Sequence, residues 1–318
     1  MTATRQLRRC DRLDEIFYWL LNMSIIASVF GMLIYLLRYI RGIPRLFIYA
    51  LWAVVFFRLV CPVGMSSKYS LLSLITGLFS KTLVRTIKVD HLSGLTASNM
   101  LQAAETYNPV TYKTELLKNI FSIASVIWII VAAAALLSAF LMYYFAMSEI
   151  KHTVLLKDNV YFGKMTDTPA LYGILRPRIV LPEGFDQEHL DYILLHEKVH
   201  MKRRDNLWRM LAVITACLHW FNPFIWFFLK CFLEDCELAC DEEAIKGLDP
   251  EERRNYARTL LACEAGQKTV FASAFGNSRV KVRIENVLSY RKLTLFSAIF
   301  FIGLLFAIIF ILLTNAKI

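Results

Sequence analysis

Four long apolar runs constrain this sequence more than any other feature. They cover residues 16–37, 46–65, 120–147 and 293–313. A helix needs roughly 20 apolar residues to cross about 30 Å of hydrocarbon, so we expect each run to span a lipid bilayer. The second run contains Arg58, which must face protein or water if that helix lies in the membrane. The pattern predicts a mostly α-helical membrane protein with about four transmembrane helices.

The distribution of basic residues predicts the orientation of the chain. Lysines and arginines gather on the cytoplasmic side of membrane helices, and five of them precede the fourth run whereas only Lys317 follows it. We therefore expect residues 148–292 to lie in the cytoplasm. The arginines near the N-terminus oppose this four-span topology, because they also favour the cytoplasm. The five residues are Arg279, Lys281, Arg283, Arg291 and Lys292.

The spacing of the apolar runs divides the chain into three parts. Residues 1–147 form a membrane region with an outer loop at about 66–118, residues 148–292 are long enough to fold as a domain, and residues 293–318 hold the fourth span and a short tail. The net charge of +10 is explained by basic residues flanking the spans, so we expect no direct nucleic-acid binding. Seven cysteines without a C-x-x-C pair indicate neither a disulfide framework nor a thiolate zinc site.

A metal-binding pattern lies within residues 148–292. The segment 190–213 contains no glycine or proline and is predicted to be one helix, which places His196 and His200 one turn apart on the same face. Two such imidazoles can bind one zinc ion, and Glu197 beside them is placed to take a proton from a zinc-activated water. Lys198 is an unusual residue inside such a motif, but on a helix it points away from the histidines. The segment predicts a zinc hydrolase with Glu197 as its catalytic base.

A third protein ligand is expected from the acidic segment 233–245. Glu237 is the first candidate, and Asp241, one turn further along, is expected to orient a ligand histidine from behind. Glu234 shares their face and is the reserve ligand, and a merely solvated acidic helix is the alternative. Residues 207–230 are apolar but cannot cross the membrane, since His200 and Glu237 would then lie on opposite sides of it. Asn222-Pro223 is expected to fold this stretch into a hairpin.

Taken together, these motifs resemble the BlaR/MecR family of bacterial membrane-anchored zinc metalloproteases, which are of the gluzincin type. The resemblance is carried by LLHEKVHMKRRDN (194–206), HWFNPFIW (219–226), ELACDEEAI (237–245) and TPALYGILRPRIVLP (168–182). It implies an α+β gluzincin-type protease domain inserted between the third and fourth spans. It also implies one Zn²⁺ held by His196, His200 and Glu237, with Glu197 as base and Asp241 as an outer partner.

The resemblance further implies how substrates are bound and cut. Ile179, Val180 and Leu181 would form an edge strand to which an extended peptide adds, and Ala274 and Phe275, in a linker before the fourth span, resemble the region where relatives cut themselves. The best-known sensors of this family continue into an extracellular penicillin-binding domain, whereas this sequence stops at Ile318. We therefore expect a transmitter without that sensor domain, working with a separate sensor protein and existing as a homodimer.

The leading hypothesis is a regulatory zinc endopeptidase that cleaves itself or a cytoplasmic winged-helix repressor after a signal at the cell envelope. A housekeeping membrane protease is the alternative among enzymes. A non-catalytic signalling scaffold is the alternative from another class, and the intact Glu197 argues against it, because a scaffold needs no base beside its metal.

Overall fold

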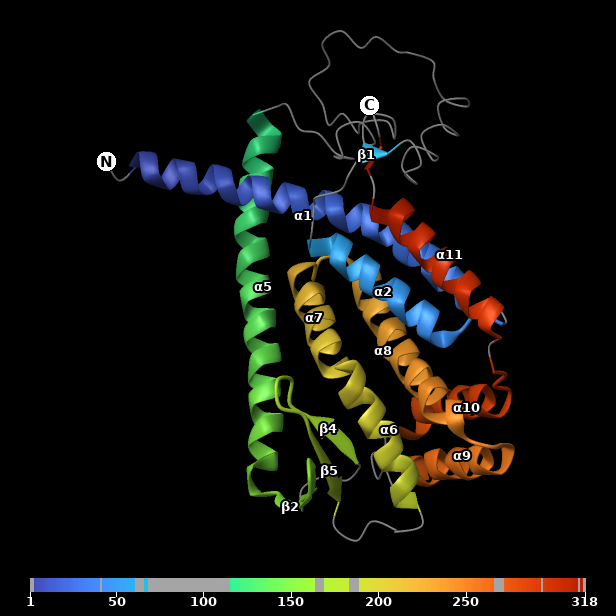
Figure 1. Cartoon of the computed structure of the whole chain (residues 1–318). Helices are drawn as coiled ribbons and strands as arrows, with labels where there is room; N and C mark the ends of the chain where they lie inside the picture. Colours follow the sequence, from blue (N-terminus) through green and yellow to red (C-terminus); the bar gives the residue numbers. More distant parts are fainter. Residues whose placement is uncertain are drawn as a thin grey trace.

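The computed structural model describes residues 3–40, 42–60, 66–67, 115–163, 169–182, 189–265, 272–292, 294–313 and 315–316, at some positions by the backbone alone. Its helices are α1 (Ala3–Leu37), α2 (Arg45–Val60), α5 (Glu115–Glu149), α6 (Leu190–Arg203), α7 (Asp205–Leu218), α8 (Pro223–Ala244), α9 (Pro250–Ala265), α10 (Ala272–Leu288) and α11 (Leu295–Leu313) (Figure 1). Its strands are β1 (Ser66–Ser67), β2 (Val154–Lys157), β3 (Val160–Gly163), β4 (Ala170–Tyr172), β5 (Arg178–Pro182) and β6 (Asn315–Ala316). The described part of the protein is therefore mostly helical, with one small sheet.

Two helices of the described chain are long and apolar enough to cross a membrane. They are Ile16–Leu37 within α1 and Ile120–Glu149 within α5. Helix α2 has 16 residues, and the apolar part of α11 is Leu295–Phe310, so both are shorter than a standard span. Two of the four expected spans thus have the required length, and the number four stays a prediction. Residues 61–65 of the expected second span and 68–114 of the expected outer loop lie outside the described residues.

Helix α2 lies in the middle of the largest apolar core. Ile48, Leu51, Trp52 and Val55 are fully buried there, packed among α1, α7, α8 and α11 (Figure 1). Arg58 of α2 is also buried, as its place in an apolar run requires. The core crosses the expected boundary at residues 147 and 148, so α1 and α2 pack directly on helices of the expected protease domain.

The segment that is predicted to bind metal is divided into two helices, whereas the sequence predicts one helix over 190–213. Arg204 adopts the left-handed conformation with φ 56°, so α6 ends at Arg203 and α7 begins at Asp205. The absence of glycine and proline gave no sign of this break.

The hairpin expected at Asn222-Pro223 is confirmed, because α7 and α8 are separated by a short turn and pack on each other. Pro223 begins α8, and the side chain of Asn222 accepts a hydrogen bond from the backbone N–H of Phe224 at 3.0 Å.

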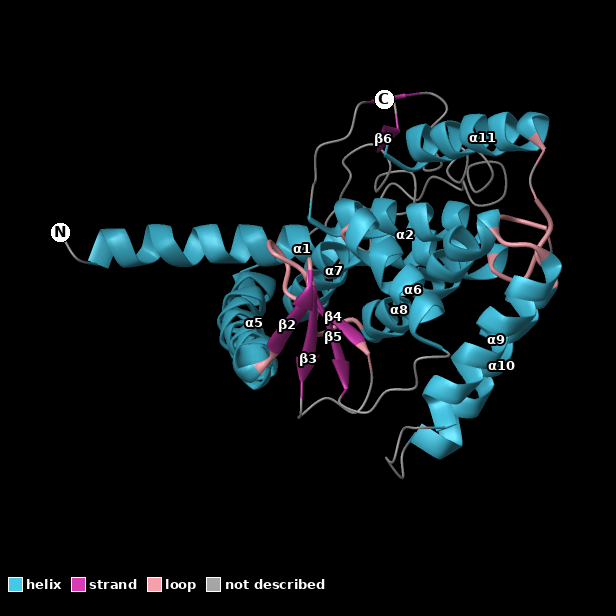
Figure 2. Ribbon diagram, turned by 60° about the horizontal axis from the view of Figure 1, so that its bottom comes forward, coloured by secondary structure: helices cyan, strands magenta, loops and turns pink. Residues whose placement is uncertain are grey.

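The sheet has the strand order β2-β3-β5-β4 and lies between α5 and helices α6 and α8 (Figure 2). Strand β5 pairs in parallel with β3 and antiparallel with β4. Ile179, Val180 and Leu181 are therefore buried in an inner strand, and the prediction that they form an edge strand is wrong. Their hydrophobic side chains fill the core on both faces of the sheet, which an edge strand does not need. The edge next to α6 is β4, which comes from the same sequence motif.

The segment with Ala274 and Phe275 also differs from expectation. The sequence suggests a linker there, but both residues lie in the first turns of α10. An extended substrate conformation would require this end of the helix to unwind. Their role in self-cleavage stays a prediction.

Candidate metal centre

His196 and His200 of α6 meet at the centre of the predicted site. Their Nε2 atoms lie 3.0 Å apart and both side chains are buried. Two nitrogens that bind one tetrahedral zinc at about 2.0–2.1 Å lie about 3.4 Å from each other. The pair is thus close to the separation that a shared metal ion requires.

Glu237 of α8 completes the predicted set of three. Its Oε2 atom lies 3.5 Å from Nε2 of His196, and its Oε1 atom lies 3.6 Å from Nε2 of His200. The structure therefore brings the two imidazoles and this carboxylate together, although they are 37 and 41 positions apart in the sequence. Glu234, the reserve candidate, points elsewhere and forms an ion pair with Arg38 at 3.1 Å.

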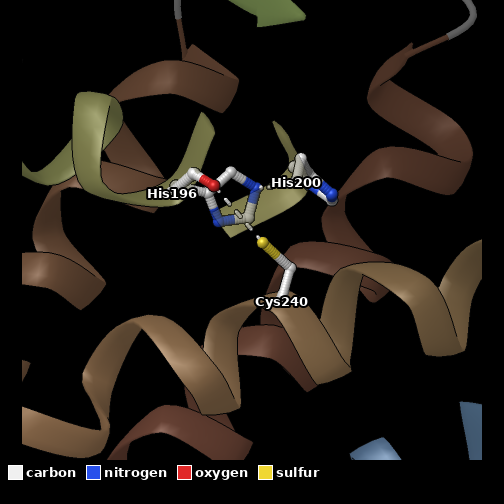
Figure 3. Close-up of side chains that lie close together, drawn as sticks. All are labelled: His196, His200 and Cys240. Carbon is white, nitrogen blue, oxygen red and sulfur yellow. Dashed lines mark hydrogen bonds between the residues drawn. The ribbon is translucent and has the colours of Figure 1, made fainter. Parts of the chain in front are cut away.

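Cys240 is a further candidate ligand that the sequence did not suggest. Ligand atoms of His196, His200 and Cys240 lie within 4.8 Å of one another (Figure 3). The thiol donates a hydrogen bond to the backbone carbonyl of His196 at 3.4 Å, so it approaches the pair from the α8 side. The two histidines fit a zinc site with either Glu237 or Cys240 as the third ligand, because imidazole, carboxylate and thiolate are all zinc ligands.

Each histidine is held from behind by a carboxylate. Nδ1 of His200 lies 2.6 Å from Oδ2 of Asp205, and Nδ1 of His196 lies 3.3 Å from Oδ1 of Asp241. The hydroxyl of Tyr256 joins the second pair, since it lies 2.8 Å from Nδ1 of His196 and donates to Asp241 at 2.8 Å. Such partners fix the ring so that the other nitrogen faces the metal. Asp241 was predicted for this position, whereas Asp205 and Tyr256 were missed.

Two arginines neutralise the carboxylates. Arg283 of α10 donates two hydrogen bonds to Asp241, at 2.7 and 2.8 Å, and its Nη1 lies 3.4 Å from Glu237. Arg209 of α7 forms an ion pair with Glu237 as well. Burial raises the pKa of Asp241, but the charge and hydrogen bonds of Arg283 outweigh it and hold that pKa below its usual range. The pKa of Glu237 is also lowered, because hydrogen bonds from the two histidines and the charge of Arg283 outweigh burial.

Glu197 lines a cavity of about 250 Å³ in front of the histidines. Burial raises its pKa above the usual value for glutamate, and the neighbouring histidines oppose this shift. A carboxylate with a raised pKa is a better proton acceptor near neutral pH. The same cavity is bordered by Ala170 and Leu171 of β4, so the sheet edge and the predicted base face one space. Lys198 is exposed and points away from it, as predicted.

Most of the missed residues have no local signal in the sequence. Tyr256 reaches His196 from α9, and Arg283 reaches Asp241 and Glu237 from α10, far along the chain. Asp205 lies inside the quoted motif, but on a continuous helix it would stand about 140° round from His200. The break at Arg204 places the carboxylate of Asp205 next to Nδ1 of His200.

A paired-histidine site with a buried glutamate, an acidic third partner and an adjacent sheet edge defines a centre of the metallopeptidase kind. The comparison with known families agrees: residues 18–287 match the model of the BlaR1 peptidase M56 family. The chain belongs to this family of membrane peptidases.

Two individual relatives are similar to this chain over less than half of its length. The methicillin resistance mecR1 protein of Staphylococcus aureus (strain Mu50) is 27% identical over 142 residues, which are 42% of this chain and 24% of that protein. The regulatory protein BlaR1 of Bacillus licheniformis is 31% identical over 133 residues, which are 39% of this chain and 22% of that protein. The match thus spans about a quarter of the length of these relatives.

Proposed function

We propose that the protein is a regulatory zinc endopeptidase of the bacterial plasma membrane, which cuts itself or a cytoplasmic repressor protein in response to an envelope signal. The convergence of His196, His200 and Glu237 on the cavity that also holds Glu197 carries this proposal. The names of the relatives, which concern regulation and methicillin resistance, support a regulatory role over a housekeeping one.

The three converging side chains would hold one zinc ion. The ion would polarise the scissile carbonyl group and lower the pKa of a water molecule. Arg209 and Arg283 compete with a cation for Glu237, so metal binding requires this carboxylate to turn from at least one of them. Asp205, Asp241 and Tyr256 keep the Nε2 atoms of both histidines directed at the cavity.

Glu197 would perform the proton transfers of peptide hydrolysis. Its carboxylate takes a proton from the attacking water and gives it to the nitrogen of the leaving amine. As the C–N bond breaks, the amine departs neutral and the carboxyl product remains. The buried position of Glu197 suits this task, because it raises the proton affinity of the carboxylate.

Strand β4 would bind the substrate backbone. It is the sheet edge beside α6, and an extended peptide can add to it through main-chain hydrogen bonds that demand little side-chain specificity. The side chain of Asn206 donates to the carbonyl groups of Leu171 and Gly173, at 2.8 and 3.0 Å. Leu171 also borders the cavity, so a substrate strand that pairs with it has to share or displace this hydrogen bond.

The test uses the full chain in membranes and compares wild type, Glu197→Gln and Lys198→Gln. Zinc content is measured together with cleavage of the chain and of co-expressed repressor proteins, with product ends assigned by mass spectrometry. We expect all three proteins to bind zinc and only Glu197→Gln to lose cleavage. Lys198→Gln is the matched control, since it alters the exposed neighbour of the base. Zinc binding without cleavage in the wild type, under all inducing conditions, would favour the signalling scaffold.

A further inference from the structure

The turn between α1 and α2 is attached to the helix that carries Glu237. Arg38, the first residue after α1, donates through Nε to Asp235 at 3.0 Å and through Nη2 to Glu234 at 3.1 Å. Asp235 is fully buried and also accepts a hydrogen bond from Nε1 of Trp52 at 2.7 Å. One carboxylate of α8 thus binds both the end of the first membrane helix and the middle of α2.

The start of α2 makes a second attachment. The backbone N–H groups of Arg45 and Leu46 donate to the carboxylate of Glu242, at 2.6 and 3.3 Å. A carboxylate at this position satisfies helix N-terminal donors and interacts favourably with the helix dipole. The side chain of Arg45 also donates to Asn286 of α10 at 3.1 Å. The turn therefore holds α8 and α10 at once.

These attachments flank the metal centre in sequence, and two of them lie on the opposite side of α8. At about 100° per residue, Asp235 and Glu242 stand about 160° and 140° round the helix from Glu237, whereas Glu234 stands beside Asp241. On α10, Asn286 is one turn from Arg283, which binds both carboxylates of the centre. Any rotation of α1 relative to α8 must either break a buried ion pair or turn the helix that presents Glu237.

We propose that Arg38 is a positioning residue for the metal centre: through Asp235 and Glu234 it fixes α8, and so couples the first membrane helix to the placement of Glu237. The proposal rests on the proposed function for its consequence in cleavage, but its effect on the metal centre stands apart from turnover. Breaking a buried ion pair by removing one partner leaves an uncompensated charge. Asp235 is buried and keeps the hydrogen bond from Trp52 but loses its cation when Arg38 is replaced, so we expect α8 to shift.

The experiment measures the metal centre directly in the full chain. Wild type, Arg38→Gln and Arg38→Lys are purified in detergent and loaded with Co²⁺, whose visible absorption reports ligand geometry. The release of Zn²⁺ to a chelator is followed in parallel. Arg38→Lys keeps the positive charge that orients the first span. It loses the planar guanidinium group that donates to two carboxylates at once. Lys246→Gln is the control, because this lysine pairs with Glu243 on the exposed surface near the end of the same helix.

We expect Arg38→Gln to change the Co²⁺ spectrum, to release zinc at least tenfold faster and to lower kcat at least tenfold with KM within twofold. Arg38→Lys should give an intermediate effect and Lys246→Gln none. Trp52→Phe, which removes only the N–H bonded to Asp235, should change the spectrum in the same direction if Arg38→Gln fails to fold. A wild-type spectrum and release rate in Arg38→Gln, or in Trp52→Phe in that case, would overturn the proposal. The Co²⁺ spectrum and the zinc release rate need no substrate. A failure of the proposed cleavage would therefore not be confused with a failure of this coupling.

Discussion

Asp205 Oδ2 lies 2.6 Å from Nδ1 of His200, and the two residues belong to different helices although they are only five positions apart. The left-handed conformation of Arg204 between them makes this contact possible. Asp205 is itself fixed, because it accepts a hydrogen bond from the hydroxyl of Tyr49 at 2.9 Å and pairs with Arg203 at 3.3 Å. The orientation of one candidate ligand therefore depends on a helix break and on a residue of α2.

Replacing Asp205 with asparagine should weaken metal binding. The amide keeps the size of the side chain but loses the charge that fixes the imidazole, and loss of such an outer partner typically costs about 10- to 100-fold in metal affinity. Zinc competition with a fluorescent chelator measures the change. Asp191→Asn is the matched control, because Asp191 lies exposed in the first turn of α6. Equal zinc affinity in both variants would show that Asp205 does not orient His200.

Local pattern predicted some parts of this centre and could not predict others. The one-turn spacing of His196 and His200 needs only a helix, and the structure places this pair on α6 and the pair Glu237 and Asp241 on α8. Their roles at a metal ion stay predictions. The inner position of Val180 depends on which strands pair, and apolar content alone does not tell an inner strand from an edge. Tyr256 and Arg209 carry no pattern of their own, since their roles come from packing of distant helices. The break at Arg204 occurs together with contacts of Asp205 to His200 and Tyr49, which no local pattern in the sequence indicates.

The identity of the third ligand can be decided by two substitutions on α8. If Glu237 binds the metal, Glu237→Gln should lose more affinity than the roughly 10- to 100-fold expected for an outer partner. Cys240→Ser should then keep affinity close to wild type, because the metal already has its third ligand and serine keeps a donor for the backbone carbonyl of His196. Isothermal titration with zinc measures both. A strong sulfur-to-cobalt charge-transfer band in the Co²⁺ protein, lost in Cys240→Ser, would instead assign the ligand to Cys240.

Zinc binding should release protons near neutral pH. Burial lowers the pKa of His200, but its hydrogen bond to Asp205 and those to Cys236, Cys240 and Glu237 raise the pKa well above the ordinary value. The metal-free pair therefore holds at least one proton that zinc must displace, and the affinity should rise with pH until it passes this raised pKa, by about tenfold per unit for each proton. Calorimetry at pH 7 in buffers of different ionisation enthalpy counts the protons. The count should fall in Asp205→Asn, and a count of zero in the wild type would contradict the raised pKa.

Close packing of α1 on α8 should make Gly31 intolerant of any side chain. A Cβ atom at Gly31 would overlap the ring of Phe228, and that ring is fully buried in the largest core, where it contacts Trp52. Overpacking of a filled core typically costs about 1–3 kcal/mol, so Gly31→Val should lower the unfolding midpoint in detergent. Gly303→Ala provides the control, because a Cβ atom there meets nothing within 4 Å. If Gly31→Val unfolds at the wild-type temperature, α1 can move away from Phe228 at little cost. The first membrane helix would then be too loosely packed on α8 to hold it in place.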